Sequence, residues 1–244
     1  MKIYGLIGKN IDYSFSRSYF KKKFEVEGIA AEYRNFDLDN IEEFKNVLRT
    51  NPVPSGLNVT IPYKQEIMRF LDQMDPVAAE IGAVNTIKFE KDGSLTGYNT
   101  DHYGFTESLR PNLKPPHTAA LILGTGGASK AVAFSLAQLK IPYSFVSRNA
   151  GANSYSYQDL TEELITSHPI IINCTPLGTY PAIEKAPKIP FDGITPAHLI
   201  FDLIYNPAVT RFMELAAANG AVTLNGYRML ELQAENAWKI WNTL

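Results

Sequence analysis

Cysteine is almost absent from this chain of 244 residues, which contains only Cys174. A single cysteine cannot form an internal disulfide, so the composition favours a reducing compartment and we expect a cytoplasmic protein. Long apolar runs are also missing, since none approaches the roughly 20 residues that span a bilayer. The opening "MKIYGLIGKN" lacks the long apolar core and the cleavage site of a signal peptide.

Neither sign of charge is in marked excess, because the net charge is −2 at pH 7. This balance gives no electrostatic reason to expect nucleic acid or a membrane surface as a partner. Repeats and low-complexity segments are absent. The apolar content of 45% and the charged content of 20% are ordinary for a globular protein. The length allows one large domain or two small ones.

Strand-like and helix-like runs alternate over the first hundred residues. Strands are expected at 2–8, 31–38 and 55–60, and helices at 17–28, 39–50, 75–83 and from Pro62 onward. Residues 84–101 read as a β-hairpin with Asp92-Gly93 as a type I′ turn. After the Pro-rich break at 110–116, buried strands at 118–124, 142–148, 169–175, 198–205 and 221–225 alternate with helices. This pattern predicts an α/β protein of two α/β domains joined near residue 101, the second doubly wound.

A glycine-rich turn, "LGTGGASKA", lies between a buried strand and a helix. Its Gly124, Gly126 and Gly127 allow a sharp turn and a close approach to a pyrophosphate at the helix N-terminus. Ser129 stands where the dinucleotide fingerprint usually has Gly or Ala. A purely structural turn is the alternative, but the strand–turn–helix context favours a Rossmann-like dinucleotide site.

The residues after the next strand indicate which dinucleotide is bound. NAD-binding proteins usually have a carboxylate there to hold the ribose 2′-hydroxyl. This chain instead has Ser147, Arg148 and Asn149. A guanidinium pairs well with a 2′-phosphate, so NADP is the expected cofactor. The alternative, a solvated surface arginine, is weakened by the missing acid.

Four polar clusters stand at expected strand ends in the first half of the chain. They contain Ser14 and Ser16; Asn58, Thr60 and Lys64; Asn85; and Asn99 with Asp101. If the strands are parallel, these ends meet in one crevice suited to a small, polyhydroxylated anion. Singly, each has a structural explanation, and Asp101 alone is better explained as a helix N-cap.

Lys64 is unusual, because Pro62 at the first helical position would place this lysine in the first turn of a helix. The positive end of the helix dipole disfavours an ammonium. Such a position would promote release of the lysine proton, while Asp101 would act in the opposite direction.

The motifs together resemble those of the shikimate dehydrogenase family over nearly the whole chain. They are "NVTIPYK", "GAVNT", "GYNTD", "GTGGASKA", "NCTPLGT", "FDLIYNP" and "GYRMLELQA". The resemblance implies NADP-dependent, reversible reduction of 3-dehydroshikimate to shikimate, a step of aromatic amino acid biosynthesis. It also implies a monomer or homodimer without a metal site.

The resemblance also implies roles for individual residues. The implied catalytic pair is Lys64 and Asp101. The implied substrate-binding residues are Ser14, Ser16 and Tyr205 at the carboxylate and Asn58, Thr60, Asn85, Asp101 and Gln233 at the ring hydroxyls. The implied NADP-binding residues are Gly124, Gly126, Gly127, Ala128, Ser147, Arg148, Gly226 and Met229. Because Gln233 lies on the last helix, we expect a substrate domain of residues 1–101 plus 226–244, with a mainly parallel sheet, and an NADP domain of residues 102–225.

Some positions depart from the family pattern, and they leave alternatives open. Tyr13 and Arg17 replace the usual His and Pro, and Ser147 and Asn149 replace the side chains that flank the family's arginine. A quinate or dual quinate/shikimate dehydrogenase using NAD or NADP is the nearest alternative. A non-catalytic NADP- or metabolite-binding protein and a generic Rossmann oxidoreductase are further ones.

Three other conspicuous features are expected to be structural. Cys174 stands at an expected strand end, and no histidine adjoins it in sequence to activate its thiol. His102 follows Asp101 on the same helix and should point elsewhere. Trp238 and Trp241 are expected to pack in the core.

Overall fold

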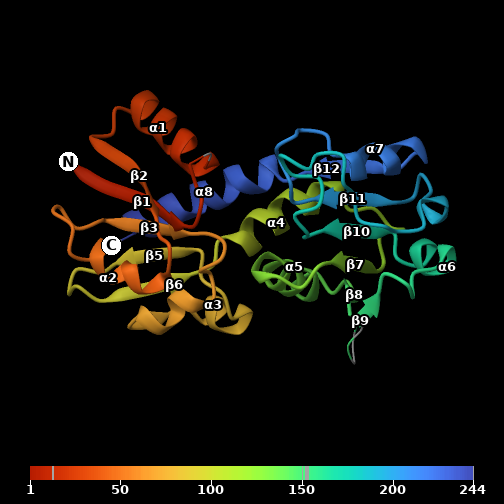
Figure 1. The fold of residues 1–244 in the computed structure, drawn as a ribbon, viewed down its shortest axis with the longest axis horizontal. Coiled ribbons are helices and arrows are strands. Elements are labelled where there is room, and N and C mark those ends of the chain that lie inside the picture. Colours follow the sequence, from red (N-terminus) through yellow and green to blue (C-terminus); the bar gives the residue numbers. More distant parts are fainter. Residues whose placement is uncertain (13, 150, 152–153, 244) are drawn as a thin grey trace. The chain divides into compact units, whose positions relative to one another are not determined.

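The computed structural model describes residues 1–12, 14–149, 151 and 154–243 and divides into two compact units. Unit 1 comprises Met1–Tyr103 and Leu230–Leu244, and unit 2 comprises Gly104–Met229. Figure 1 shows the ribbon coloured along the chain. The Pro-rich segment 110–116 lies within unit 2, and Tyr13 lies outside the described residues.

Unit 1 has a mixed six-stranded sheet in the order β2-β1-β3-β5-β6-β4. Its strands are β1 (Lys2–Gly8), β2 (Ala31–Asp37), β3 (Gly56–Val59), β4 (Gln73–Met74), β5 (Thr86–Phe89) and β6 (Leu95–Tyr98). β1 is parallel to β2 and β3, and β4 is parallel to β6, whereas β5 runs antiparallel to β3 and β6. The start of β5 therefore lies at the same edge as the ends of β3 and β6.

Helices cover both faces of this sheet (Figure 1). They are α1 (Phe15–Glu27), η1 (Ile41–Glu43), α2 (Phe44–Val47), η2 (Glu66–Phe70), α3 (Pro76–Ile81) and most of α8 (Tyr227–Asn242). On one face α1 and α8 enclose an aromatic cluster that includes Tyr4, Phe20 and Trp241. On the other, α2, η2 and α3 pack on alternate residues of the same strands, such as Leu57 and Ile87.

Two local expectations in unit 1 are wrong. The helix expected from Pro62 begins at Glu66, as a 3₁₀ helix, so Lys64 lies in the preceding turn. The reason is that the Lys64 carbonyl accepts a hydrogen bond from the Val84 N–H, at 2.7 Å, instead of from a following helical turn. The 86–98 hairpin is confirmed, but its turn is not type I′, because Gly93 has a positive φ and Asp92 does not.

Unit 2 is built on a fully parallel sheet in the order β12-β11-β10-β7-β8-β9. Its strands are β7 (Ala120–Leu123), β8 (Tyr143–Ser147), β9 (Ser154–Ser156), β10 (Ile170–Asn173), β11 (Leu199–Asp202) and β12 (Val222–Asn225). Counted from β7, the spatial order is 3-2-1-4-5-6, that of the doubly wound dinucleotide-binding fold. The predicted fold class is confirmed.

The helices of unit 2 form two layers, one on each side of that sheet (Figure 1). They are α4 (Asp101–Leu109, of which the residues from Gly104 belong to unit 2), η3 (Arg110–Asn112), α5 (Gly127–Gln138), α6 (Glu162–Thr166), η4 (Phe191–Gly193) and α7 (Arg211–Ala218). α4 and α5 pack on one face, which includes Ile122 and Ile172. α6 and α7 pack on the other, which includes Leu121 and Ile171. The strands are therefore apolar on both sides, as their sequences predict.

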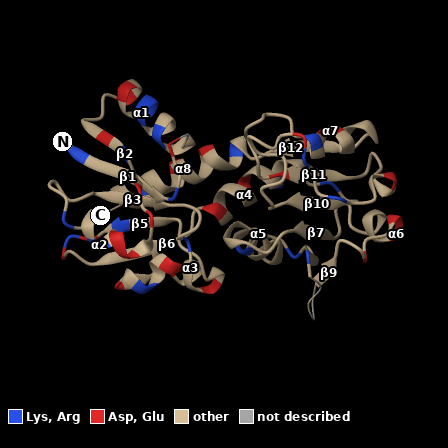
Figure 2. Ribbon diagram, in the orientation of Figure 1, with Lys and Arg blue, Asp and Glu red and all other residues tan. Residues whose placement is uncertain are grey.

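Charged side chains of both signs are intermixed along the ribbon of both units (Figure 2). Within the described residues, no helix combines the length and the apolar character needed to cross a membrane.

Candidate active site

Lys64 and Asp101 form an ion pair in unit 1 although 37 positions separate them in the chain. Lys64 Nζ lies 2.6 Å from Asp101 Oδ2, and the two side chains are 15% and 8% exposed. A charge-assisted hydrogen bond of this length holds the ammonium in one place. The pair is shielded from bulk water but is not sealed from it.

Asn99, and not Asp101, caps helix α4. The Asn99 Oδ1 accepts hydrogen bonds from the backbone N–H groups of Asp101, at 3.0 Å, and His102, at 3.3 Å. The interpretation of Asp101 alone as the cap is therefore wrong, because an asparagine two residues earlier takes that role. Asp101 is instead the first residue of α4, where the helix dipole favours a negative charge.

Asn85 fixes the other oxygen of the Asp101 carboxylate. The backbone N–H of Thr100 donates to Asn85 Oδ1 at 2.7 Å, which sets the orientation of the amide. The Asn85 Nδ2 then donates to Asp101 Oδ1 at 2.9 Å and to Gln233 Oε1 at 3.3 Å. Asp101 therefore has a lysine on one oxygen and a buried amide on the other, which leaves its carboxylate little freedom to rotate.

Asn58 joins this network from the neighbouring strand β3. Its Nδ2 donates to the Asn85 carbonyl at 3.3 Å and to Thr86 Oγ1 at 3.2 Å, and its Oδ1 accepts from the Tyr33 hydroxyl at 2.8 Å. Asn58, Asn85 and Asp101 are all at most 5% exposed. A buried polar cluster of this size is unusual for a core and typical of a site.

Gln233 reaches the cluster from α8, whose position is fixed by contacts with α1. The Gln233 Oε1 also accepts a hydrogen bond from Thr100 Oγ1 at 3.4 Å. Two residues further on, Glu235 accepts hydrogen bonds from Tyr19 and, at 2.9 Å, from Lys23, both in α1. These contacts tie the two helices together and thereby position Gln233.

Ser14 and Ser16 lie at the start of α1, in the same unit. Ser14 is the N-cap, and its Oγ accepts a hydrogen bond from the Arg17 N–H at 3.2 Å. Ser16 is buried within the first turn. The Arg17 guanidinium, which departs from the family pattern, donates to the Asp12 carbonyl at 2.7 Å. The N-cap explanation of Ser14 is confirmed, and it leaves the hydroxyl proton of Ser14 able to bind an anion.

The remaining two substrate-binding candidates, Thr60 and Tyr205, belong to different units. Thr60 directly follows β3, and its backbone N–H donates to the Ile7 carbonyl at 2.8 Å. Tyr205 follows β11 in unit 2. Its approach to Ser14 and Ser16 therefore stays a prediction.

The glycine-rich turn of unit 2 has the geometry expected of a phosphate cradle. Gly124 directly follows β7 with a φ of +101°, which favours glycine. Gly126 is the N-cap of α5, and a Cβ built there meets no atom within 4 Å. The open space lies beside the first-turn N–H groups of α5, which begins with Gly127 and Ala128.

Arg148 follows β8, the neighbour of β7, and is exposed. The Ser147 hydroxyl donates to the Asn149 carbonyl and so closes the turn that presents Arg148. No carboxylate stands among residues 147–149. The strand end is therefore suited to an anion such as a 2′-phosphate.

Gly226 and Met229, expected near the nicotinamide, have evident structural roles. A Cβ at Gly226 would lie 2.1 Å from the Leu203 carbonyl oxygen, so only glycine fits there. Met229 is buried in the core of unit 2. Their contact with a cofactor stays a prediction.

Cys174 and the two tryptophans behave as structural residues, whereas the bystander role of His102 stays a prediction. Burial, followed by the Asp202 carboxylate, raises the pKa of the Cys174 thiol. Burial lowers the pKa of His102, against the opposing charge of Asp101. Trp238 and Trp241 pack in the aromatic cluster of unit 1.

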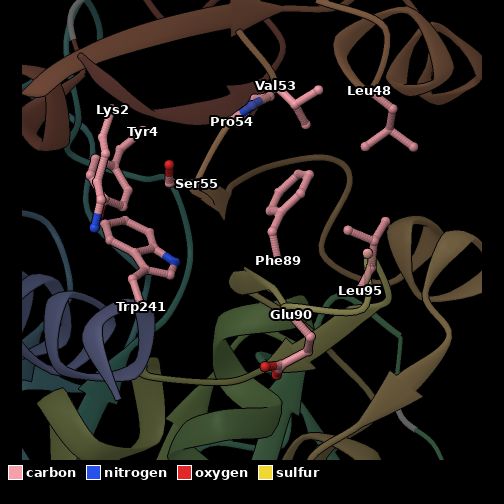
Figure 3. A pocket seen from close by; sticks show the side chains of 11 residues that line it. Lys2, Tyr4, Leu48, Val53, Pro54, Ser55, Phe89, Glu90, Leu95 and Trp241 are labelled. Atoms are coloured by element: carbon pink, nitrogen blue, oxygen red, sulfur yellow. The ribbon is translucent and has the colours of Figure 1, made fainter. Parts of the chain in front are cut away.

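Figure 3 shows the side chains that line a cavity of about 490 Å³ in unit 1. It is lined by Lys2 and Tyr4 at the start of β1, by Ser55 just before β3, and by Phe89 at the end of β5. The polar cluster occupies the other ends of these strands. The cavity is therefore separate from the candidate site.

Sequence reasoning missed three members of the cluster. Thr86 and Thr100 follow Asn85 and Asn99 directly, so the repeated Asn-Thr dipeptide was the available signal. Both threonines bond to Asn85 Oδ1, through their hydroxyls at 3.1 and 3.2 Å. The third member, Tyr33, had no signal beyond its place in a strand.

The chemistry that unit 1 can perform follows from this arrangement. A lysine ammonium is fixed by a carboxylate, among amides and hydroxyls that can bind a polyol. Such a set can deliver a proton to an oxygen of the ligand or take one from it. Unit 2 supplies the cradle for a dinucleotide.

Comparison with known proteins gives three consistent findings. The family model for the shikimate dehydrogenase substrate binding domain matches residues 6–87. A shikimate dehydrogenase (NADP(+)) of Desulforamulus reducens is 34% identical, over 98% of this chain and 89% of the relative. The crystal structure of shikimate 5-dehydrogenase from Thermus thermophilus, in complex with NADP(H) and shikimate, is also similar. It matches with a TM-score of 0.88 and 28% identity, over 100% of this chain and 94% of that one.

A quinate dehydrogenase from Corynebacterium glutamicum, in complex with NAD, matches equally well in structure. Its TM-score is 0.88 at 27% identity, and the match covers 100% of this chain and 94% of that one. Structural similarity therefore does not distinguish between shikimate and quinate as the substrate.

Proposed function

The chain belongs to the shikimate dehydrogenase family, and on that premise we propose that it catalyses the reversible, NADP-dependent reduction of 3-dehydroshikimate to shikimate. The observation that carries the proposal is the Lys64–Asp101 pair at 2.6 Å within a buried network of amides and hydroxyls. A metabolite-binding protein without catalysis has no need of a fixed ammonium there.

Lys64 is the proposed acid in reduction and the base in oxidation. A bound NADPH would supply a hydride to the ketone carbon, and the carbonyl oxygen would then require a proton. Lys64 Nζ donates the proton that this oxygen needs, while Asp101 orients the ammonium and stabilises its charge. Asn85 keeps the carboxylate in place throughout.

The start of α1 is the proposed site of the substrate carboxylate. Because the Ser14 oxygen accepts the Arg17 N–H, the hydroxyl proton of Ser14 points away from the helix. The N-terminus of this 13-residue helix adds a favourable dipole for an anion. Asn58, Thr60, Asn85 and Gln233 are the proposed partners of the ring hydroxyls.

NADP is the proposed cofactor because the residues of unit 2 fit it. The open space beside Gly126 and the first turn of α5 accept a pyrophosphate. Arg148, with Ser147, would hold the 2′-phosphate, which NAD lacks. On this proposal unit 1 binds the substrate and unit 2 the cofactor. A cytoplasmic location and a monomeric or homodimeric state remain predictions.

Initial rates test the function directly. The purified chain is assayed for oxidation of shikimate and of quinate, each with NADP and with NAD. We expect kcat/KM to be highest for shikimate with NADP. A higher value for quinate would replace the proposal by the quinate alternative, which the resemblance to the quinate dehydrogenase keeps open. No oxidation of either substrate would contradict both.

A further inference from the structure

Arg17 stands in the first turn of α1, where a positive charge is unfavourable. Its backbone N–H donates to the Oγ of the N-cap Ser14 at 3.2 Å, and the first turn contains no acidic residue. The free N–H groups and the dipole of a helix N-terminus favour a carboxylate in this turn and disfavour a guanidinium. The stability of α1 therefore does not explain why an arginine stands here.

The Arg17 side chain folds back past the start of its own helix. Its Nη2 donates to the backbone carbonyl of Asp12, five residues earlier in the chain, at 2.7 Å. Because Asp12 precedes the N-cap Ser14, this bond holds the guanidinium beside the N-terminal end of α1. Arg17 is nevertheless exposed, so that a ligand can reach it.

The charge of the Arg17 guanidinium is not balanced by an ion pair within the described residues. Asp12 contributes its carbonyl oxygen to the bond, and not its carboxylate. Four other arginines of the same part of the chain do pair with a glutamate, at distances of 2.6–3.4 Å, namely Arg34, Arg69, Arg110 and Arg211. Arg17 therefore differs from them in having its charge available to a ligand.

The donors at this end of α1 suit a carboxylate. A guanidinium has five N–H groups in a planar fork that matches the two oxygens of a carboxylate, and Asp12 uses only one of them. The Ser14 Oγ accepts the Arg17 N–H and so keeps its own proton for another acceptor. Ser16 lies in the same helical turn.

We propose that Arg17 binds the substrate carboxylate together with Ser14 and Ser16, and that it makes this chain selective for a charged substrate. The inference rests on the proposed function, which places the carboxylate at the start of α1. The usual family residue at this position is a proline, which carries no charge, so the arginine is an addition of this chain to the site. The ligand class is a small, hydroxylated carboxylate.

Arg17→Ala tests this assignment through the KM for shikimate. We expect that KM to rise about 10–100-fold at saturating NADP, the range of a lost hydrogen bond to a charged group. The value of kcat should change less than about threefold, because the carboxylate is not the group that reacts. The KM for NADP should stay unchanged. Arg17→Lys keeps the charge without the fork and should raise the KM for shikimate less than Arg17→Ala does.

A neutral analogue distinguishes carboxylate binding from a purely structural role of Arg17. The methyl ester of shikimate keeps the ring hydroxyls but has no charge, and its Ki is measured as an inhibitor of shikimate oxidation. If Arg17 binds the carboxylate, Arg17→Ala should leave this Ki within about twofold of the wild-type value, because the lost contact involves only the charge. If Arg17 only closes the turn onto Asp12, the Ki should rise as much as the KM for shikimate.

The salt dependence of the KM gives a second readout that needs shikimate alone. Added NaCl screens the attraction between an exposed guanidinium and a carboxylate. The KM for shikimate should therefore rise with NaCl more steeply in the wild type than in Arg17→Ala. Equal salt dependence of the two would overturn the assignment, also where the methyl ester does not inhibit.

Lys21→Ala is the matched control. Lys21 is an exposed cation four residues further along the same face of α1. Its loss removes the same charge from the helix and should leave the KM for shikimate as in the wild type. A rise as large as that of Arg17→Ala would show that the charge of the helix, and not a bond from Arg17, attracts the substrate. Circular dichroism verifies that each variant is folded.

The outcomes separate the role of Arg17 from the function itself. A wild-type chain that oxidises neither shikimate nor quinate contradicts the proposed function. An active wild type in which Arg17→Ala leaves the KM for shikimate unchanged, or raises the Ki of the ester equally, overturns the role of Arg17 alone. If Arg17→Ala does not fold, the same measurements are made with Arg17→Gln, which keeps an N–H donor for the Asp12 carbonyl but has no charge.

Discussion

Contacts with residues distant in sequence position Lys64, and the lysine does not lie in the first turn of a helix as the sequence predicts. The local sequence suggests a lysine inside a helix, but the Lys64 carbonyl is bound to Val84 and the helix starts at Glu66. The ammonium is held by Asp101 at the start of α4. Its proposed role in proton transfer therefore depends on this pair and not on the dipole.

The first prediction concerns this ammonium. We expect Lys64→Ala to lower kcat for shikimate oxidation by about 10²–10⁴-fold, the usual contribution of a general acid or base. KM should change far less, because the lysine acts mainly on the transition state. Steady-state kinetics with saturating NADP provides both values.

Lys88→Ala is the control for this variant. The Lys88 side chain is 14% exposed and forms an ion pair with Glu90 at 2.9 Å, so its burial and pairing resemble those of Lys64. It lies in β5, and its loss should leave kcat within about twofold, as for most positions outside the site. A Lys64→Ala enzyme that keeps kcat within a few-fold of wild type would refute the assignment.

The second prediction for a single residue concerns Arg148. Arg148→Ala should raise the KM for NADP by about 10–100-fold, the range of a lost hydrogen bond to a charged group. The KM for NAD should stay unchanged, because NAD has no 2′-phosphate. Arg110→Ala removes an arginine of the same unit whose side chain is 57% exposed, and it should alter neither value. An equal rise in the KM for NADP and the KM for NAD would show that Arg148 does not bind the 2′-phosphate.

Among the elements, the β7–α5 and β12–α8 connections show that glycines serve two different purposes. At Gly226, before α8, a Cβ would meet backbone 2.1 Å away, so glycine is needed for packing. At Gly126 a Cβ would meet nothing within 4 Å, and φ is −76°, which any residue adopts. Protein packing and backbone strain therefore do not explain Gly126, whereas the proposed pyrophosphate close to the turn would.

The prediction for this element contrasts the two glycines. Gly126→Ala should fold normally and raise the KM for NADP about tenfold, equal to about 1.4 kcal/mol of binding free energy. The KM for shikimate should not change. Gly226→Ala should instead lower the unfolding free energy by about 1–3 kcal/mol or more, because of overpacking. Kinetics and thermal unfolding of both variants check this. An unchanged KM for NADP in Gly126→Ala would argue against the cradle.

At the scale of the whole molecule, both units bury polar groups, and one of them, Asp202, makes stability depend on pH. In unit 2 the Asp202 carboxylate is fully buried and accepts hydrogen bonds from Asn173 at 3.0 Å and Thr210 at 2.6 Å. It thereby joins the end of β10 to the N-terminus of α7. Burial raises the pKa of Asp202 to about 6, against the lowering effect of these hydrogen bonds.

This shift predicts how stability changes with pH. Because the pKa is raised on folding, the folded state favours the protonated acid. The resulting stabilisation is complete below the unfolded value of 3.8 and is lost as the pH rises to about 6. The loss amounts to about 3 kcal/mol, at about 1.4 kcal/mol per pKa unit.

Asp202→Asn removes this titration. The unfolding free energy of the wild type minus that of the variant should therefore fall between pH 4 and pH 7. Urea denaturation followed by circular dichroism at several pH values measures the difference. A difference that is constant over this range would show that Asp202 does not titrate as described.

The local pattern of the sequence determined the elements and the fold class of this protein. Apolar strand residues, helix caps and the C-cap Gly28 affect the conformation of their immediate neighbours in the chain. For this reason β1, α1 and β7 lie where they were expected. The motifs around Gly124 and Asn85 likewise identified the family, and the comparisons confirm it. The confirmed part of the prediction thus rests on short-range interactions.

Only the tertiary structure decided how the site is assembled. The Lys64–Asp101 pair and the hydrogen bond from Tyr33 to Asn58 join residues from distant parts of the chain. Spacing along the chain cannot specify such contacts, because each depends on strand order and on which carbonyls are already bonded. At Lys64, for example, the carbonyl is bonded to the N–H of Val84, a residue distant in sequence, and the helix begins only at Glu66.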